Sequence, residues 1–64
     1  MILLKIYIEK NILSIDNYNQ IIDVKSDLIK LENIEIAGSD LSIRFLDKYR
    51  IVVSGSFKNI RLGE

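Results

Sequence analysis

The sequence predicts an all-β fold, a small meander of short strands arranged as a sandwich, a barrel or a β-roll. First, β-branched residues dominate, because the 64 residues include 13 Ile and 3 Val against a single Ala, the best helix former. Second, apolar and polar residues alternate in short runs with the period of two that is typical of strands. Third, turn-forming residues separate these runs, and the chain has no linker-like tract. We therefore expect one domain over residues 1–64.

Each predicted strand is a short apolar run that ends at a turn signal. The most hydrophobic run, residues 2–8, is far shorter than the ~18 residues that a membrane helix needs, and Lys5 interrupts it. No basic segment precedes it, so we expect a strand there and not a signal peptide. Tight turns are expected at Gly38-Ser39-Asp40 and at Gly55-Ser56. The eight predicted strands cover residues 2–8, 12–15, 21–24, 28–31, 34–36, 41–45, 49–54 and 57–62.

The pattern of residues 21–31 is also compatible with a helix. Apolar residues at positions 21, 24, 28 and 31 have the spacing of a helix face. However, Ile22 and Ile29 would lie off that face, and Ser26-Asp27 interrupts it. Two strands are the favoured interpretation of this segment.

Two parts of the chain have similar sequence patterns. Residues 34–45 and residues 51–62 share apolar alternation, a Gly-Ser pair at the fifth position and a second apolar run. A Gly at that position fits a backbone with positive φ, so repeated strand-turn-strand units around one core are one interpretation. The core positions expected from alternation are Ile6, Ile15, Val24, Ile36, Ile43, Ile51, Val53 and Ile60.

Composition excludes several kinds of chemistry. The chain has no Cys and no His, which removes disulfides, a thiolate nucleophile, the commonest general base and the usual zinc ligands. We expect no catalytic residue, no bound metal and no cofactor, and hence no enzyme. A domain of about 60 residues buries only about 60% of its unfolded surface, so self-association or a protein partner is expected to add stability.

Two local clusters resemble ligand sites only superficially. Asp16, Asn17, Asn19 and Asp23 gather side-chain oxygens, but the spacing and the missing Gly do not match a calcium loop, so we interpret them as turn residues. The Gly-Ser segments precede no predicted helix and lack the glycine spacing of a phosphate-binding loop.

Charge is distributed unevenly, although the formal net charge is zero. Residues 1–42 have a net charge of −3, and residues 43–62 have a net charge of +4. If Arg44, Arg50 and Arg61 share one sheet face, they form a basic patch that could contact phosphates or an acidic protein. A solvated strand face is the favoured interpretation, and binding of nucleic acid is not expected.

Some strands carry apolar side chains on both faces. Leu3 and Tyr7 point away from the apolar face of the first strand, and Val52 points away from Ile51 and Val53. A single two-layer core cannot cover both faces of every strand, so Tyr7 and Val52, together with Arg44, Arg50 and Arg61, are our candidate partner-contact residues. A twisted small barrel that covers them is the favoured interpretation of the apolar ones.

From Ile12 onward the chain resembles the YabP/YqfC family of small sporulation proteins from spore-forming Firmicutes. The segments that carry the resemblance are residues 13–18, residues 29–31, the run Ile34-Glu35-Ile36-Ala37-Gly38-Ser39-Asp40-Leu41-Ser42-Ile43, and the run Ile51-Val52-Val53-Ser54-Gly55-Ser56-Phe57-Lys58-Asn59-Ile60.

The resemblance implies a non-enzymatic protein made during sporulation. It implies a binding or assembly role at the spore envelope or coat, beside a membrane or coat protein, in the cytoplasm of the mother cell or at the periphery of the forespore membrane. A self-assembling structural protein is the alternative, and a binder of nucleic acid or of anionic surfaces is a weaker one. The resemblance supplies no functional residues.

Overall fold

The computed structural model describes residues 4–63, and in this range the chain forms six β-strands and no helix. The all-β prediction is therefore confirmed, and the helix alternative for residues 21–31 is wrong because that segment forms two strands. The predicted strand at residues 2–8 is described only from residue 4, so Ile2 and Leu3 lie outside the described residues. The strands are β1 (Lys5–Glu9), β2 (Ile12–Asp16), β3 (Ile21–Val24), β4 (Leu28–Leu31), β5 (Ile34–Leu46) and β6 (Arg50–Leu62).

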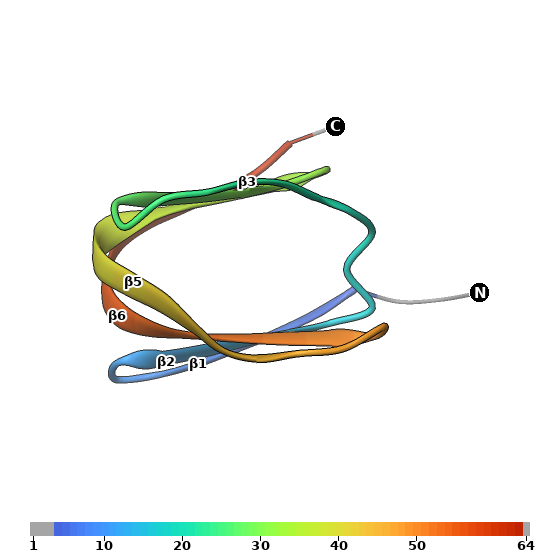
Figure 1. The fold of residues 1–64 in the computed structure, drawn as a ribbon, viewed down its shortest axis with the longest axis horizontal. Coiled ribbons are helices and arrows are strands. Elements are labelled where there is room, and N and C mark those ends of the chain that lie inside the picture. The colour runs from blue at the N-terminus through green and yellow to red at the C-terminus, as the bar shows by residue number, and fades with distance from the viewer. Residues whose placement is uncertain (1–3, 64) are drawn as a thin grey trace.

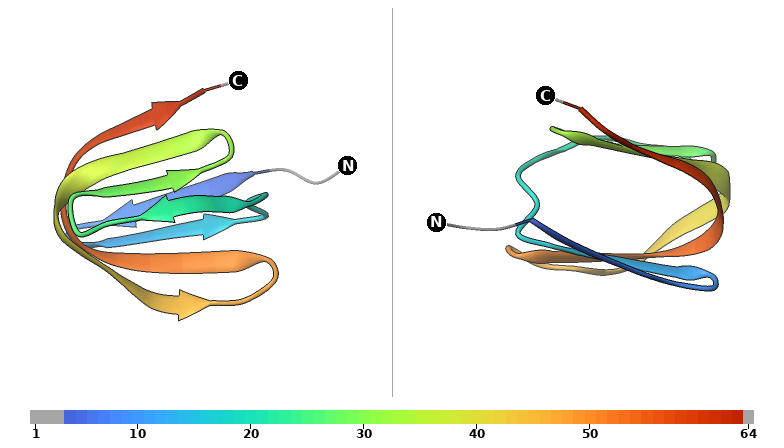
Figure 2. Two further views of the ribbon diagram at one scale, coloured as in Figure 1. Left: turned by 45° about the horizontal axis from the view of Figure 1, so that its top comes forward. Right: turned by 180° about the vertical axis from the view of Figure 1, so that it is seen from behind.

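All six strands belong to one antiparallel sheet in the order β1-β2-β6-β5-β4-β3. The sheet is folded over on itself, because the long strands β5 and β6 curve around one end of the molecule (Figures 1 and 2). We call the two halves the lower and upper layers, as Figure 1 is oriented. The lower layer contains β1, β2 and residues 42–46 and 50–54; the upper layer contains β3, β4 and residues 34–37 and 57–62.

Two glycines allow β5 and β6 to bend between the layers. A Cβ atom on Gly38 would lie less than 3.0 Å from the carbonyl oxygen of Ser56, and Gly55 has a φ of 141°. The register between β5 and β6 shifts on both sides of this region, as in a β-bulge. The expected turns at Gly38-Ser39-Asp40 and Gly55-Ser56 are therefore wrong, because the chain bends there while strand pairing continues. This is why six strands replace the eight predicted.

The segment between β2 and β3 crosses from the lower to the upper layer. It leaves β2 at Asn17, which has a φ of 62° and donates its backbone N–H to the carbonyl oxygen of Tyr49. The Tyr18 hydroxyl donates to the carbonyl oxygen of Asp47, with a distance of 2.6 Å between the two oxygens. The Asp47 carboxylate accepts the backbone N–H groups of Tyr49 and Arg50, which fixes the β5–β6 turn.

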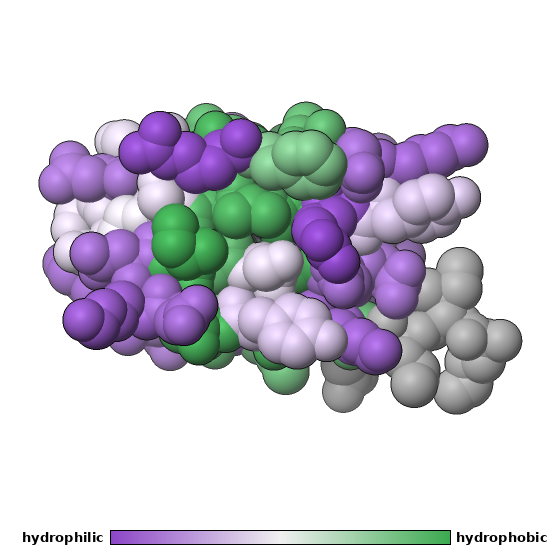
Figure 3. All heavy atoms as spheres, turned by 90° about the horizontal axis from the view of Figure 1, so that it is seen from below, coloured by the Kyte–Doolittle hydropathy of each residue, from purple (hydrophilic) through white to green (hydrophobic). Residues whose placement is uncertain are grey.

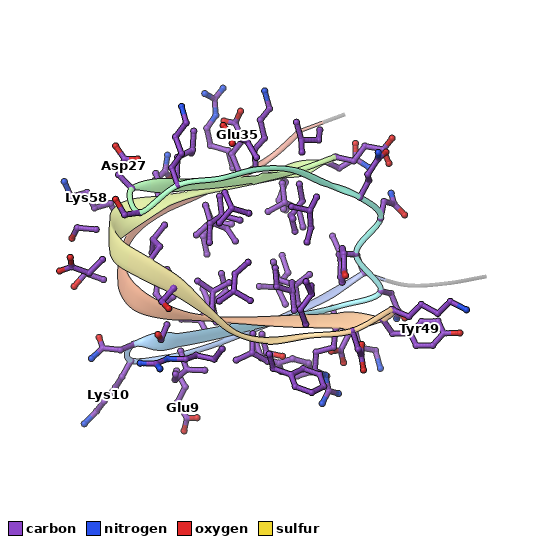
Figure 4. All side chains as sticks on the ribbon, viewed as in Figure 1. Glu9, Lys10, Asp27, Glu35, Tyr49 and Lys58 are labelled. Carbon is purple, nitrogen blue, oxygen red and sulfur yellow. The ribbon has the colours of Figure 1, made fainter. Side chains whose placement is uncertain are left out.

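The hydrophobic core lies between the two layers (Figure 4). Of the predicted core positions, Ile15, Ile36, Ile51 and Val53 are fully buried, and Ile6, Ile43 and Ile60 pack against them partly buried. The prediction that Val24 is a core residue is wrong. Val24 is 46% exposed, because it lies on the edge strand β3, where no strand covers its outer side. The buried core consists of Leu13, Ile15, Ile29, Leu31, Ile34, Ile36, Leu41, Ile51 and Val53.

The strand register reveals an approximate twofold relation between the layers. The hairpin β1–β2 packs beside the first half of β6 in the same way as the hairpin β3–β4 packs beside the first half of β5. Val53 pairs with Leu13 as Ile36 pairs with Ile29, and Gly55 follows Val53 by two residues as Gly38 follows Ile36. The two similar segments, which are offset by 17 residues in the sequence, therefore correspond to two equivalent bent strands.

Candidate functional site

A row of mainly apolar side chains crosses the outer face of the lower layer. Tyr7 pairs with Ser14, Ser14 with Val52, and Val52 with Phe45, so these four side chains lie side by side across four strands. We call them the aromatic row. Tyr7 is 56% exposed and Phe45 is 49% exposed, whereas Val52 is half-buried between its neighbours. Figure 3 views this face and shows apolar side chains gathered in its middle with hydrophilic ones around them.

A charged row borders the aromatic row on one side. Lys5 pairs with Asp16, and Asp16 pairs with Arg50. The guanidinium of Arg50 donates two hydrogen bonds to the Asp16 carboxylate, from Nε to Oδ1 at 2.6 Å and from Nη2 to Oδ2 at 3.2 Å. These bonds are the largest cause that lowers the pKa of Asp16 below its usual 3.8; burial opposes them, and the charges of Arg50 and Lys5 lower the pKa further. The same hydrogen bonding raises the pKa of Arg50.

A bulge shapes the other border of the aromatic row. The register shifts between Ile43 and Phe45, so Arg44 is an extra residue in β5. Arg44 donates from Nε to the Ser54 hydroxyl at 2.8 Å, and Phe45 pairs with Val52 on the same outer face. Simple alternation from Leu41 and Ile43 places Phe45 on the core face, which is wrong because the bulge interrupts the alternation. No local signal in the sequence marks this bulge.

The upper layer carries a charged row at the equivalent position. Asp23 pairs with Lys30, Lys30 with Glu35, and Glu35 with Arg61, which alternates the sign of charge across four strands. Glu35 forms ion pairs with Lys30 at 3.6 Å and with Arg61 at 4.0 Å. Figure 4 shows Glu35 pointing outward from the upper layer. Arg61 therefore lies on the face opposite Arg44 and Arg50, and the three arginines do not form one basic patch.

The twofold relation makes the two outer rows directly comparable. It places Tyr7 in the position of Asp23, Val52 in that of Glu35, and Phe45 in that of Arg61. The fold therefore accepts four polar side chains in such a row. The architecture therefore does not require apolar residues at these positions.

A hollow lies at the open end of the sandwich, opposite the bend. It has a volume of about 290 Å³ and is lined by the crossing segment and by the β4–β5 and β5–β6 turns, including Tyr18, Asn33 and Tyr49. Among residues 4–63, the polar side chains of its lining are amides, phenols and one lysine. Within residues 4–63, no group of three or more acidic side chains is placed to hold a metal ion.

The fold and its faces define a small antiparallel β-sandwich domain, with the aromatic row on one outer face and a row of four charged residues on the other. Comparisons with protein-family models, with curated proteins and with solved structures find no match to this chain. In the part of the chain that the structure describes, no helix is long and apolar enough to cross a membrane.

Proposed function

We propose that the protein is a non-enzymatic binding module that docks on a protein partner through the aromatic row. The observation that carries the proposal is the contrast between two equivalent rows on the same fold, one of them charged and the other mainly apolar. Tyr7, Val52 and Phe45 offer the exposed aromatic and aliphatic surface that is typical of the centre of an interface.

The borders of the aromatic row fit the rim of such an interface. Arg50 is held by its two hydrogen bonds to Asp16, and Arg44 is held by Ser54, so neither side chain must be ordered when a partner binds. Polar and charged groups at a rim contribute orientation and selectivity more than affinity. The partner surface that fits this arrangement is apolar at its centre and carries acidic groups at its border.

The resemblance to the YabP/YqfC family supports a setting for this module. In this proposal the protein acts in the mother cell during sporulation and docks on a membrane or coat protein at the spore envelope. A nucleic-acid or anionic-surface role is less well supported, because Arg44 and Arg50 are engaged by neighbouring side chains and Arg61 lies on the other face. Binding through phosphate contacts would weaken steeply with added salt, which separates the two ideas.

Affinity capture of tagged variants from sporulating cells, in mild detergent, tests the proposal. Phe45→Lys places a charge in the aromatic row at a position that is already half exposed. Asn59→Lys is the matched control, because Asn59 is an exposed residue of β6 on the outer face of the upper layer. Circular dichroism must show that both variants fold like the parent protein.

The expected result is a membrane or coat protein that follows the parent protein and Asn59→Lys but not Phe45→Lys. A partner that follows all three proteins equally would contradict docking through the aromatic row. Capture that fails for all three only when salt is raised would instead favour binding through phosphate contacts.

A further inference from the structure

The folded sheet leaves four strand edges unpaired among residues 4–63. In the lower layer these are β1 and residues 42–46 of β5, and in the upper layer they are β3 and residues 57–62 of β6. Unpaired edges present backbone N–H and C=O groups that can pair with another chain, and most proteins block them with bulges or charges. The four edges of this chain differ in whether they are blocked.

Three of the edges carry either a bulge or charges of a single sign. The register of β3 shifts between Ile21 and Asp23, and that of β5 shifts between Ile43 and Phe45, so both edges are bulged. The exposed edge of β6 carries Lys58 and Arg61 with no acidic residue between residues 57 and 62, so two copies would bring only positive charges together.

The edge of β1 has no bulge. All five residues pair in continuous register with β2, from Lys5 with Asp16 to Glu9 with Ile12. The outer side chains along this strand are Lys5, Tyr7 and Glu9, so the strand presents a positive, an aromatic and a negative group in turn. The inner side chains are Ile6 and Ile8, and Ile8 is 57% exposed although it pairs with the fully buried Leu13.

The register also shows which backbone groups of β1 face outward. Gly55 donates its N–H to the carbonyl oxygen of Asn11, and Asn17 donates to that of Tyr49, so the odd-numbered residues of β2 point their backbone groups at β6. The even-numbered residues of β2 therefore point theirs at β1. Their partners Lys5, Tyr7 and Glu9 return those bonds, which leaves the backbone groups of Ile6 and Ile8 at the free edge.

We propose that β1 pairs antiparallel with β1 of a second copy of this chain, in a register centred on Tyr7. In this register Ile6 lies opposite Ile8 of the second copy, so the free backbone groups of the two strands meet. Lys5 lies opposite Glu9 of the second copy, and by symmetry this charge pair occurs twice. Tyr7 lies opposite its own equivalent, in the pair where side chains approach most closely.

The consequences for the sandwich agree with this arrangement. Pairing joins the two lower layers into one continuous sheet and covers the exposed side of Ile8. It also joins the two aromatic rows end to end through Tyr7, which gives one longer apolar surface. The proposal goes beyond the proposed function and stands without it, because it uses the edge of β1 and needs no other partner.

Charge reversal at the two ends of β1 tests the register. Lys5→Glu sets two carboxylates opposite each other at both ends of the paired strands, and Glu9→Lys sets two ammonium groups opposite each other there. We expect either single change to weaken self-association about tenfold or more, measured by sedimentation equilibrium. A mixture of the two variants, and the double variant Lys5→Glu/Glu9→Lys, should each restore it. Lys58→Glu, on the edge of β6, is the matched control and should leave association unchanged.

Disulfide trapping gives a second measurement that does not depend on charge. The chain has no Cys, so Tyr7→Cys introduces one thiol per copy, opposite its equivalent at the ~4.5 Å Cα separation of such a pair. Tyr7→Cys should form a covalent dimer under mild oxidation, whereas Tyr49→Cys, which replaces the 62% exposed Tyr49 in the β5–β6 turn, should not. Folding of each variant is checked by circular dichroism.

Restoration by the mixture together with selective trapping at position 7 would support the proposal. A parent protein that stays monomeric at all concentrations, or trapping that is equally fast at positions 7 and 49, would overturn it. Dimerisation that is equally strong in the parent protein, in Lys5→Glu and in Glu9→Lys would also overturn it, because another edge or face would then form the dimer. None of these outcomes depends on whether Phe45→Lys loses a protein partner, so the two proposals fail separately.

Discussion

Arg50 and Asp16 join β6 to β2 through two parallel hydrogen bonds on the outer face of the lower layer. The Nε–Oδ1 distance is 2.6 Å and the Nη2–Oδ2 distance is 3.2 Å, which is the fork geometry that matches a guanidinium to a carboxylate. The two residues are 34 positions apart in the sequence. The pair therefore fixes the alignment of the β1–β2 hairpin against the central strands, next to the aromatic row.

The Asp16–Arg50 pair should make stability depend on pH in acid. The pKa of Asp16 in the folded protein lies below its usual 3.8, so the unfolded chain binds the proton more readily. The stabilisation is present above about pH 4 and is lost as the pH falls through the folded pKa. We expect Asp16→Asn to lower the free energy of unfolding at about pH 7. At about pH 2 the unfolding free energies of the variant and the parent protein should be nearly equal. Urea unfolding at both pH values measures these free energies. A difference between variant and parent that is the same at both pH values would contradict the prediction.

Gly38 should not tolerate any side chain. A Cβ atom there would lie less than 3.0 Å from the carbonyl oxygen of Ser56, a backbone atom that cannot move without disturbing the β5–β6 pairing. Because a domain of this size has a total stability of only about 3–5 kcal/mol, we expect Gly38→Ala to leave the chain largely unfolded. Gly63→Ala is the control, since nothing lies within 4 Å of its Cβ position. Thermal unfolding compares the two, and similar transition temperatures would disprove the role given to Gly38.

Burial should separate two isoleucines that the sequence presents alike. Ile36 is fully buried between the layers, whereas Ile22 is 54% exposed on the edge strand β3. We expect Ile36→Ala to cost about 2–5 kcal/mol of unfolding free energy, and Ile22→Ala to cost less than about 1 kcal/mol. Chemical denaturation of both variants gives the difference. Equal losses would mean that the edge strand is covered in solution.

The Tyr18 hydroxyl should stabilise the crossing segment. It donates to the carbonyl oxygen of Asp47 at 2.6 Å and so ties the connection between the layers to the β5–β6 turn. Tyr18→Phe removes only this bond, so we expect a loss of about 0.5–1.5 kcal/mol. Tyr49→Phe, a change of an exposed tyrosine in the same turn, should be neutral. Unfolding free energies from denaturation test the pair of variants, and a neutral Tyr18→Phe would contradict the role of the bond.

The strand content could be predicted from local pattern, and the long strands could not. Alternation and turn residues correctly located β2, β3 and β4, and the β5–β6 turn lies in the gap between the predicted strands at residues 41–45 and 49–54. Gly38 and Gly55 were expected to end strands, because glycine is common in turns. In the structure they allow two continuous, paired strands to bend where their backbones approach closely. That bend depends on contacts between segments 17 residues apart in the chain.

The candidate surface was also predicted only in part. Tyr7 and Val52 lie together on one outer face, with Arg44 and Arg50 at its borders, while Arg61 lies on the opposite face. Whether these residues contact a partner stays a prediction. Phe45 belongs to the same row and was not anticipated, because a bulge at Arg44 turns it outward.

Local sequence pattern is enough to predict that this protein is built from strands, because the choice between helix and strand depends on side chains only a few residues apart. The polar residues Ser14 and Asp16 beside Ile15 likewise indicate which side of β2 is buried. That the sheet folds over at Gly38 and Gly55, and which residues share its outer faces, is seen only in the folded chain. Strand register and layer crossing arise from contacts between distant segments, and no local pattern of residues encodes them.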